Sequence, residues 1–236
     1  MTSAHLDFQY VRGSASQARS PGHSGSPPPR HYLRVRHSSA VVRLTRRPGS
    51  LPDVEFFDVA RQRRMTRRFA PRPVARDVLD RIVAAATSAP TAGKTGGVEL
   101  LVLDSAERRA LFWELASDRA WRENGRESVG LMAAPVLIVP VADPDAYIAR
   151  YGRPDKEGTA LHGLAAADWP VPYWIVDASF AAMLTLLAAA DAGLGALFFQ
   201  LHAPAETVLA GLGLPPTRVL IGALAIGHPA LDPPTI

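Results

Sequence analysis

The spacing of hydrophobic residues predicts helices and strands over most of the chain. Between Pro73 and Pro90, apolar residues recur at intervals of three and four, the period of an amphipathic helix. Two short and almost wholly apolar runs, VELLVLD (98–104) and VLIVPVA (136–142), instead indicate buried strands. The same reasoning predicts helices over 54–64, 105–117, 144–151, 173–192 and 204–212, and strands over 196–199 and 218–227. We therefore expect one domain over residues 53–236, with Asp53 as the N-cap of its first helix.

The first fifty residues have a different composition. Residues 13–30, GSASQARSPGHSGSPPPR, contain almost no side chain that could be buried, so they cannot offset the entropy cost of ordering. We expect residues 1–52 to be a disordered extension. Three alternatives are open. The segment could be a transit peptide or a polyanion-binding arm, or the gene could be assigned too long, with the true start of the protein near Val54. A secretory signal is not expected because no apolar run follows a positive start.

The charge distribution argues against a nucleic-acid-binding domain. The whole chain carries a net charge of +4, but its first fifty residues contain eight Arg and one acid, Asp7. The remaining residues therefore carry −3, and no basic face is expected on the domain. The chain has no Cys, which excludes disulfides, thiolate nucleophiles and cysteine-ligated metals. This composition fits a cytoplasmic protein, which is the predicted location.

The long apolar segment over 173–192 is predicted to be a core helix. It has the length of a membrane span, but it carries Asp177 and Asp191 and is rich in Ala, which inserts poorly. Residues 152–172, rich in Gly, Pro and charge, are predicted to form a long surface loop. His162, His202 and His228 do not have the spacing of a metal site, and none is expected.

Two polar segments could bind an anionic ligand. RRMTRRF (63–69) has four Arg in six positions, and Arg can pair with phosphate through two hydrogen bonds. Such a cluster is also common as a solvated surface. SAPTAGK (88–94) lies between a helix and a strand and offers small residues, backbone amides, a hydroxyl and a cation. It could approach a flat ring or a phosphate closely, or it could be an ordinary connection.

Together, these segments resemble the nitroreductase family, whose members open with an RRSxRxF-like pattern and carry an APS-type loop before a strand. Ala134-Pro135, the segment PYWIVDASFAAMLTLLAAADAGLGALFF and the terminal IGALAIGHP follow in the family's order, so the resemblance covers roughly residues 56–229. It is closest to an actinobacterial-looking branch with RRM in place of RRS. The resemblance implies an α+β fold with a mainly antiparallel sheet flanked by helices. It also implies a domain-swapped homodimer with two FMN sites at the interface.

The resemblance further implies a flavin site with no catalytic side chain. Arg63, Arg64 and Arg67 would hold the FMN phosphate, with Met65 where Ser is usual. Pro90, Thr91, Ala92 and Gly93 would line the ring and the ribityl chain, and Lys94 would either place a charge near the flavin or face water. Leu194, Gly195 and Ala196 would bring backbone against the ring, where an amide near N5 stabilises the reduced form. NAD(P)H would reduce FMN and leave before a small planar acceptor, nitroaromatic or quinone-like, takes its place.

Three departures from the family pattern bear on how tightly FMN is held. Met65 lacks the usual hydroxyl, Gly96 stands at a position that is commonly Gln, and no basic residue follows Arg218. Each lost charge-assisted hydrogen bond would cost about 1.5–3 kcal/mol. These departures favour a second hypothesis, a degenerate flavin-binding protein with little or no turnover. A third, a nucleic-acid-associated protein acting through the Arg-rich extension, ranks below both.

Overall fold

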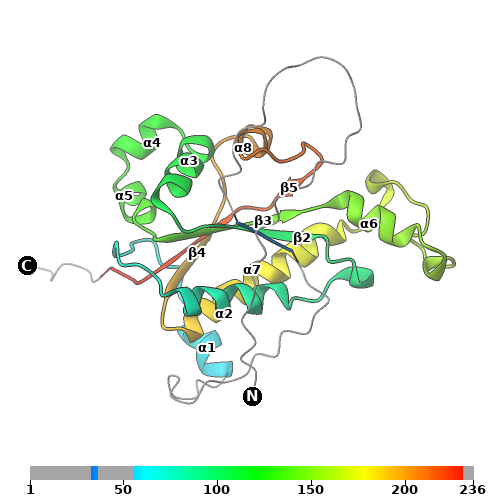
Figure 1. Ribbon diagram of the computed structural model, residues 1–236, viewed down its shortest axis with the longest axis horizontal. Coiled ribbons are helices and arrows are strands. Elements are labelled where there is room, and N and C mark those ends of the chain that lie inside the picture. Colours follow the sequence, from blue (N-terminus) through cyan, green and yellow to red (C-terminus); the bar gives the residue numbers. More distant parts are fainter. Residues whose placement is uncertain (1–32, 37–55, 231–236) are drawn as a thin grey trace, which may run out of the picture.

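The computed structural model of the protein describes residues 33–36 and 56–230. Figure 1 shows a twisted sheet with helices on both of its faces. Its central strands are neighbours in the order β1-β2-β3-β6-β4, every pair is antiparallel, and β5 pairs with the end of β3. The strands are β1 (Leu33–Arg36), β2 (Val98–Leu103), β3 (Val136–Ala142), β4 (Gly195–Phe199), β5 (Val219–Leu220) and β6 (Ala223–Gly227). The predicted α+β class with a mainly antiparallel sheet is confirmed.

The helices divide into two layers and one projecting arm. In Figure 1, α2 and α7 lie on one side of the sheet, α3 and α8 lie on the other, and α6 extends from one end. The helices are α1 (Phe56–Gln62), α2 (Arg76–Thr87), α3 (Ala106–Ala116), α4 (Arg119–Asn124), α5 (Arg126–Met132), α6 (Pro144–Tyr151), α7 (Tyr173–Asp191) and α8 (Ala205–Gly211).

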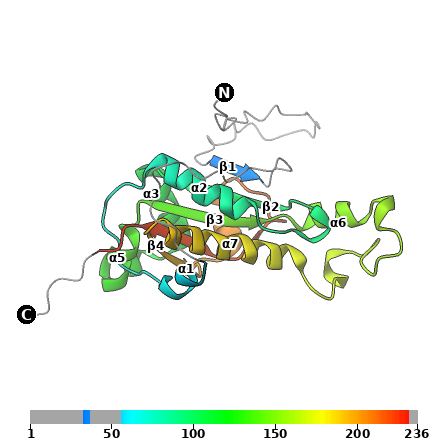
Figure 2. The same ribbon diagram turned by 90° about the horizontal axis from the view of Figure 1, so that it is seen from below.

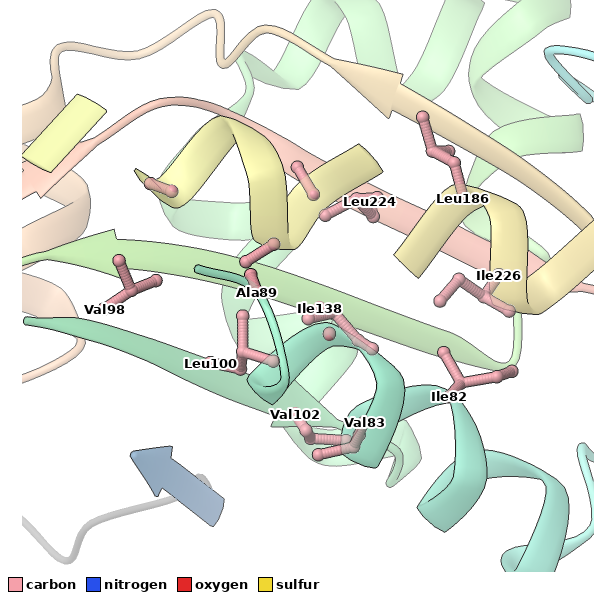
Figure 3. Packing of buried hydrophobic residues seen from close by; sticks show 14 of the residues in the cluster. Ile82, Val83, Ala89, Val98, Leu100, Val102, Ile138, Leu186, Leu224 and Ile226 are labelled. Carbon is pink, nitrogen blue, oxygen red and sulfur yellow. The ribbon is translucent and has the colours of Figure 1, made fainter. Parts of the chain in front are cut away.

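The alternation of side chains along the strands gives each helical layer its own core. On β3, Val136 and Ile138 face α2 and α7, whereas Leu137 and Val139 belong to the core beneath α3 and α8. Figure 3 shows Ile138 in the first core with side chains of α2 and α7 around it. Burying a Leu, Ile or Val side chain contributes about 1.5–3 kcal/mol. Because both faces are covered, β2 and β3 are buried throughout, which explains why their sequences are apolar except for Glu99 of β2.

Helix α7 is the central helix of the first layer. Length and composition alone would let it cross a membrane, but its Ala-rich face, including Ala178, Ala181 and Ala189, is buried against α2 and the sheet. Figure 2 shows α7 running beside α2 across the sheet. The prediction of a core helix is therefore confirmed.

The predicted elements agree with the structure except in four places. Residues 118–134, for which no element was predicted, contain α4 and α5, which are short and have no long apolar stripe. The strand predicted over 218–227 is two strands, because Gly222 has a φ of 140° and breaks the run between β5 and β6. The segment 152–172 is an irregular connection, as predicted, but it contains two 3-10 turns, Pro154–Lys156 and Ala166–Asp168, and Trp169 anchors it in the core.

The fourth difference concerns the N-terminal extension. Residues 33–36 form β1 and pair with β2, with Leu33 opposite Val102 and Arg36 opposite Glu99. The prediction that all of 1–52 is disordered is therefore wrong for these four residues, which extend the sheet by one strand. The rest of that segment and the N-cap expected at Asp53 lie outside the described residues.

Candidate functional site

The arginine segment that follows α1 lies against the start of β4. Met65 and Ala196 form a parallel bridge, and the amide of Thr66 donates to the carbonyl of Ala196 at 2.9 Å. This approach requires glycine at position 195, because a Cβ there would lie 2.5 Å from Thr66 Oγ1. The structure thus brings Arg63, Arg64, Met65 and Arg67 together with Leu194, Gly195 and Ala196, two groups more than 125 residues apart in sequence.

The guanidinium groups of this segment differ in what they bind. Arg64 donates to the carbonyl oxygens of Arg61 and Arg63, so part of its hydrogen-bonding capacity is used within its own segment. The side chains of Arg63 and Arg67 have no hydrogen bond or ion pair among the residues the structure describes. Arg67 is exposed and Arg63 half-buried. Two cations beside a close-packed backbone are therefore available to an external anion.

The second predicted segment is a tight turn between α2 and β2. Residues Ala92–Lys94 form a 3-10 turn in which Gly93 and Lys94 have φ of 63° and 54°. The ring of Tyr151 packs so closely on Gly93 that a Cβ there would lie 2.9 Å from Cε2. Lys94 is exposed. Pro90, Thr91, Ala92 and Gly93 thus present a compact backbone surface with little side chain to obstruct a ligand.

Two hydrogen-bonded anchors hold this turn in place. On one side, Asp177 Oδ2 of α7 accepts from the amide of Ala92 at 2.8 Å and from the hydroxyl of Tyr147 at 2.7 Å. Burial, and then the bond to Asp177, raise the pKa of the Tyr147 phenol well above its usual range. On the other side, Arg150 Nε donates to the carbonyl of Gly93 at 2.8 Å. Arg150 also donates to both carboxylate oxygens of Asp155, at 2.8 and 2.7 Å. This pairing raises the pKa of the Arg150 guanidinium.

Within one subunit, the two predicted segments lie at opposite ends of α7. The turn at Ala92 is bonded to Asp177, near the helix start, whereas β4 and the arginine segment follow the helix end at Asp191. At about 1.5 Å per residue, Asp177 and Asp191 are about 21 Å apart along the axis. Figure 2 agrees, with α6 beyond one end of α7 and α1 nearer the other. One subunit therefore does not gather all the predicted residues around a single point.

The structure gives a physical reason for one of the departures from the family pattern. Gly96 has a φ of 65°, a left-handed conformation that glycine adopts without strain, and its amide donates to Thr91 Oγ1 at 3.1 Å. Arg218 is bound to Asp143 and lies 3.9 Å from Asp145, so it is engaged far from the arginine segment. Met65 is 36% exposed and supplies no polar group. The structure does not describe the last residues, 231–236.

Sequence reasoning missed the residues that shape both segments. In the sequence, Asp177 argues against a membrane span, but an acid inside an apolar helix is also a sign of a buried polar contact. Tyr147 and Arg150 had no signal that singled them out. Thr66 also had no signal of its own, although its side chain packs on Gly195. No group of three or more potential metal ligands occurs among the described residues.

An open cavity of about 290 Å³ lies elsewhere, between α2, α3 and the start of β3. Its polar lining comes from Arg76, Asp104 and Arg109, and none of the predicted site residues reaches it. Arg109 there donates to the carbonyls of Asp104 and Pro135, so its charge serves to join α3 to the neighbouring chain segments.

Comparison with solved structures places this arrangement among known folds. An enone reductase, CLA-ER, matches with a TM-score of 0.59 and 23% identity over 79% of this chain and 94% of that one. A nitroreductase from Desulfovibrio desulfuricans, solved in complex with FMN, matches with a TM-score of 0.56 and 22% identity over 76% and 89%. At these identities the likeness establishes the fold.

Sequence comparison extends the match to the family. The chain is 29% identical over 169 residues to a protein of Bacillus subtilis (strain 168) named FMN reductase [NAD(P)H]. The matched region is 71% of this chain but only 63% of that relative, so the chain spans less than two thirds of it. The model of the Nitroreductase family matches residues 60–228, which include both candidate segments. This chain therefore belongs to the nitroreductase family.

Proposed function

We propose that the protein is an FMN-dependent oxidoreductase that passes electrons from NAD(P)H to a small planar acceptor. The observation that carries the proposal is the pair Arg63 and Arg67, whose guanidinium groups have no partner among the described residues. Their segment lies with its backbone against the start of β4, where Met65 is bridged to Ala196. A phosphate beside the edge of a flat ring fits this combination of cations and close backbone. The names of the relatives, FMN reductase and a nitroreductase in complex with FMN, support it.

The residues present fit FMN in its two parts. Arg63 and Arg67 would bind the phosphate, with Arg64 beside them, and the backbone from Leu194 to Ala196 would lie against the ring. When bound, FMN supplies the hydride chemistry that no side chain here can perform. The protein's own contribution is to bind and orient the ring, with an amide of the chain placed near N5, and to exclude water from it. No acid–base pair is required.

We propose further that each site is shared by two copies of the chain. Since the turn at Pro90–Lys94 lies about 21 Å along α7 from the arginine end, one subunit cannot place both on one flavin. A second copy, packed in the opposite direction, would bring its turn to the first copy's arginines. Exposed apolar side chains support such a contact: α7 presents Ile175, Phe180 and Met183, and α1 presents Phe56 and Phe57.

The acceptor would enter over the ring face vacated by the nicotinamide, in a ping-pong sequence. The connection over 152–172 begins beside Gly93, because Arg150 binds both the carbonyl of Gly93 and the carboxylate of Asp155 within the connection. The connection is therefore placed to shape that entrance. A nitroaromatic or a quinone-like compound is the proposed class of acceptor, because such compounds are flat and accept electrons without needing a protein nucleophile.

The alternative is a flavin-binding protein with little or no turnover. Met65 supports it, because this exposed thioether stands where a phosphate-binding hydroxyl is usual. The lack of a basic residue after Arg218 supports it as well. The remaining departure, Gly96, is explained by its backbone conformation and does not weigh toward this alternative. Cytoplasmic location remains a prediction, and so does the absence of a role in binding nucleic acid.

A visible absorption spectrum under argon tests the proposal. Purified protein supplied with FMN should show a bound-flavin spectrum that bleaches on adding NADH or NADPH and returns on adding a quinone. The double variant Arg63→Ala/Arg67→Ala should lose FMN but keep the wild-type circular dichroism spectrum. Unchanged flavin occupancy in that variant would refute the phosphate assignment, and bound flavin that NAD(P)H cannot bleach would favour the alternative.

A further inference from the structure

A buried carboxylate on α7 has no part in the electron transfer proposed above. Asp177 is 2% exposed and lies among Ala, Leu and aromatic side chains of the first core. Burying a carboxylate is costly unless hydrogen bonds replace its lost water. A side chain kept at such a cost in the middle of an apolar helix needs a structural or functional reason.

Its hydrogen bonds join three distant segments at one oxygen atom. Oδ2 accepts the amide of Ala92, 85 residues earlier in the sequence, and the hydroxyl of Tyr147, 30 residues earlier. The ring of Tyr147 is completely buried and lies edge-on to Trp174, so the hydroxyl is fixed in direction. Tyr147 therefore holds the carboxylate, and the carboxylate holds the turn.

The turn depends on such a hold because its conformation is unfavourable by itself. Lys94 is the only described residue other than glycine with a positive φ, and it follows directly on Gly93, which also has one. L-residues avoid this region because Cβ approaches the backbone, and strained backbone of this kind persists only where its surroundings determine it. Ala92, whose amide Asp177 binds, is the first residue of that strained turn.

We propose that Asp177 is a positioning residue for the flavin ring, acting through the amide of Ala92, with Tyr147 fixing the carboxylate. The inference rests on the proposed function, in which Pro90–Lys94 lines the ring. Asp177 touches neither the ring nor the phosphate. Its loss should therefore weaken every ligand that contains the isoalloxazine ring, whether or not the ligand carries a phosphate.

The test compares riboflavin with FMN in titrations of the full chain, followed by flavin fluorescence. Asp177→Ala should weaken the binding of both ligands by the same factor, about tenfold or more, because two donors lose their acceptor. Tyr147→Phe should weaken both by a few-fold. Asp177→Asn, whose carbonyl oxygen can accept both bonds, should recover most of the loss. The matched control is Ser117→Ala, a buried hydroxyl beneath the other face of the sheet, which should change neither affinity.

Hydrogen exchange of the flavin-free protein gives a second readout. Peptides covering 88–97 should exchange faster in Asp177→Ala than in wild type, and at the wild-type rate in Ser117→Ala. If Asp177→Ala fails to fold, Tyr147→Phe decides by the same two measurements.

Two results would overturn the inference: wild-type riboflavin affinity in Asp177→Ala or Tyr147→Phe, or unchanged exchange of the turn. An Asn variant that binds no better than the Ala variant would also contradict it. Failure of the proposed function would give a different result, because the wild-type protein would then bind neither riboflavin nor FMN. The exchange rates of residues 88–97 would still report whether Asp177 holds the turn.

Discussion

Gly195→Ala is the single substitution that most directly tests how the arginine segment is held. The added Cβ would lie 2.5 Å from Thr66 Oγ1 and 2.8 Å from both Cβ and Cγ2 of the same side chain. Position 195 has no positive φ, so alanine adds a clash without backbone strain. Either β4 or the arginine segment must move.

The arginine segment should be the part that moves. Strand β4 is paired with β6 along its whole length, from Gly195 opposite Gly227 to Phe199 opposite Ala223. The arginine segment is joined to β4 by the bridge between Met65 and Ala196 and by the hydrogen bond from the amide of Thr66 to the carbonyl of Ala196. Overpacking of this kind costs about 1–3 kcal/mol. If that cost falls on the bound position of the arginines, FMN affinity should drop by about 5- to 150-fold, at about 1.4 kcal/mol per factor of ten.

Flavin fluorescence titration measures this drop, and urea unfolding shows whether the rest of the domain is unaffected. Thr66→Ala is the control, since it keeps the backbone bond to Ala196 and should bind FMN nearly as wild type does. The double variant Gly195→Ala/Thr66→Ala should regain part of the lost FMN affinity, because two of the three colliding atoms of Thr66, Oγ1 and Cγ2, are gone. Wild-type FMN affinity in Gly195→Ala would refute the close approach of the segment to β4.

Three further outcomes follow from the described contacts. Arg150→Ala should raise the KM for the acceptor several-fold, because it frees both Gly93 and the start of the 152–172 connection. Asp155→Asn loses only a solvent-exposed pairing and should change that KM little. Equal effects of both variants in steady-state assays would contradict the role of Gly93. The pKa of the Tyr147 phenol is raised on folding, so the stability that this phenol confers is complete below its unfolded pKa of 10.0 and falls as the pH rises above that value. Urea midpoints measured from pH 9 to 11 should therefore decline less in Tyr147→Phe than in wild type. Parallel declines in the two proteins would count against the buried phenol. Phe180→Asp, on the exposed face of α7, should convert a dimer to a monomer in gel filtration, whereas Ala210→Asp on α8 should not; a dimer that survives Phe180→Asp would place the subunit contact elsewhere.

The sequence predicted most of the fold because each central element carries a strong local signal. Strands β2 and β3 are short apolar runs buried on both faces, and α2 repeats its apolar residues at helical spacing between two prolines. Helices α4 and α5 were missed because they are six and seven residues long and have no long apolar stripe. Strand β1 was missed because its four residues gain their stability from pairing with β2, which local composition does not reveal.

The candidate site was predictable only as two separate segments. Arg63 and Gly195 could be identified from motif order, but their contact depends on the path of β4 through the sheet. The supporting residues were less accessible still: Tyr147 and Asp177 look like ordinary members of a short helix and a core helix until the fold brings them to one amide. Residues that act through another residue leave a weaker trace in a single sequence than residues that face the ligand.

The separation of the two segments along α7 makes a shared site testable with mixed subunits. One chain would carry Arg63→Ala/Arg67→Ala, and the other Asp177→Ala. The first variant removes the phosphate-binding arginines, and the second removes the support of the turn at Pro90–Lys94. In a heterodimer with shared sites, one site combines both defects, while the other combines the intact arginines of one chain with the intact turn of its neighbour. Differently tagged chains, co-expressed and purified through both tags, should therefore bind about one FMN per dimer with wild-type affinity. If each subunit formed its own site, every site would carry one defect, and no tight binding would return.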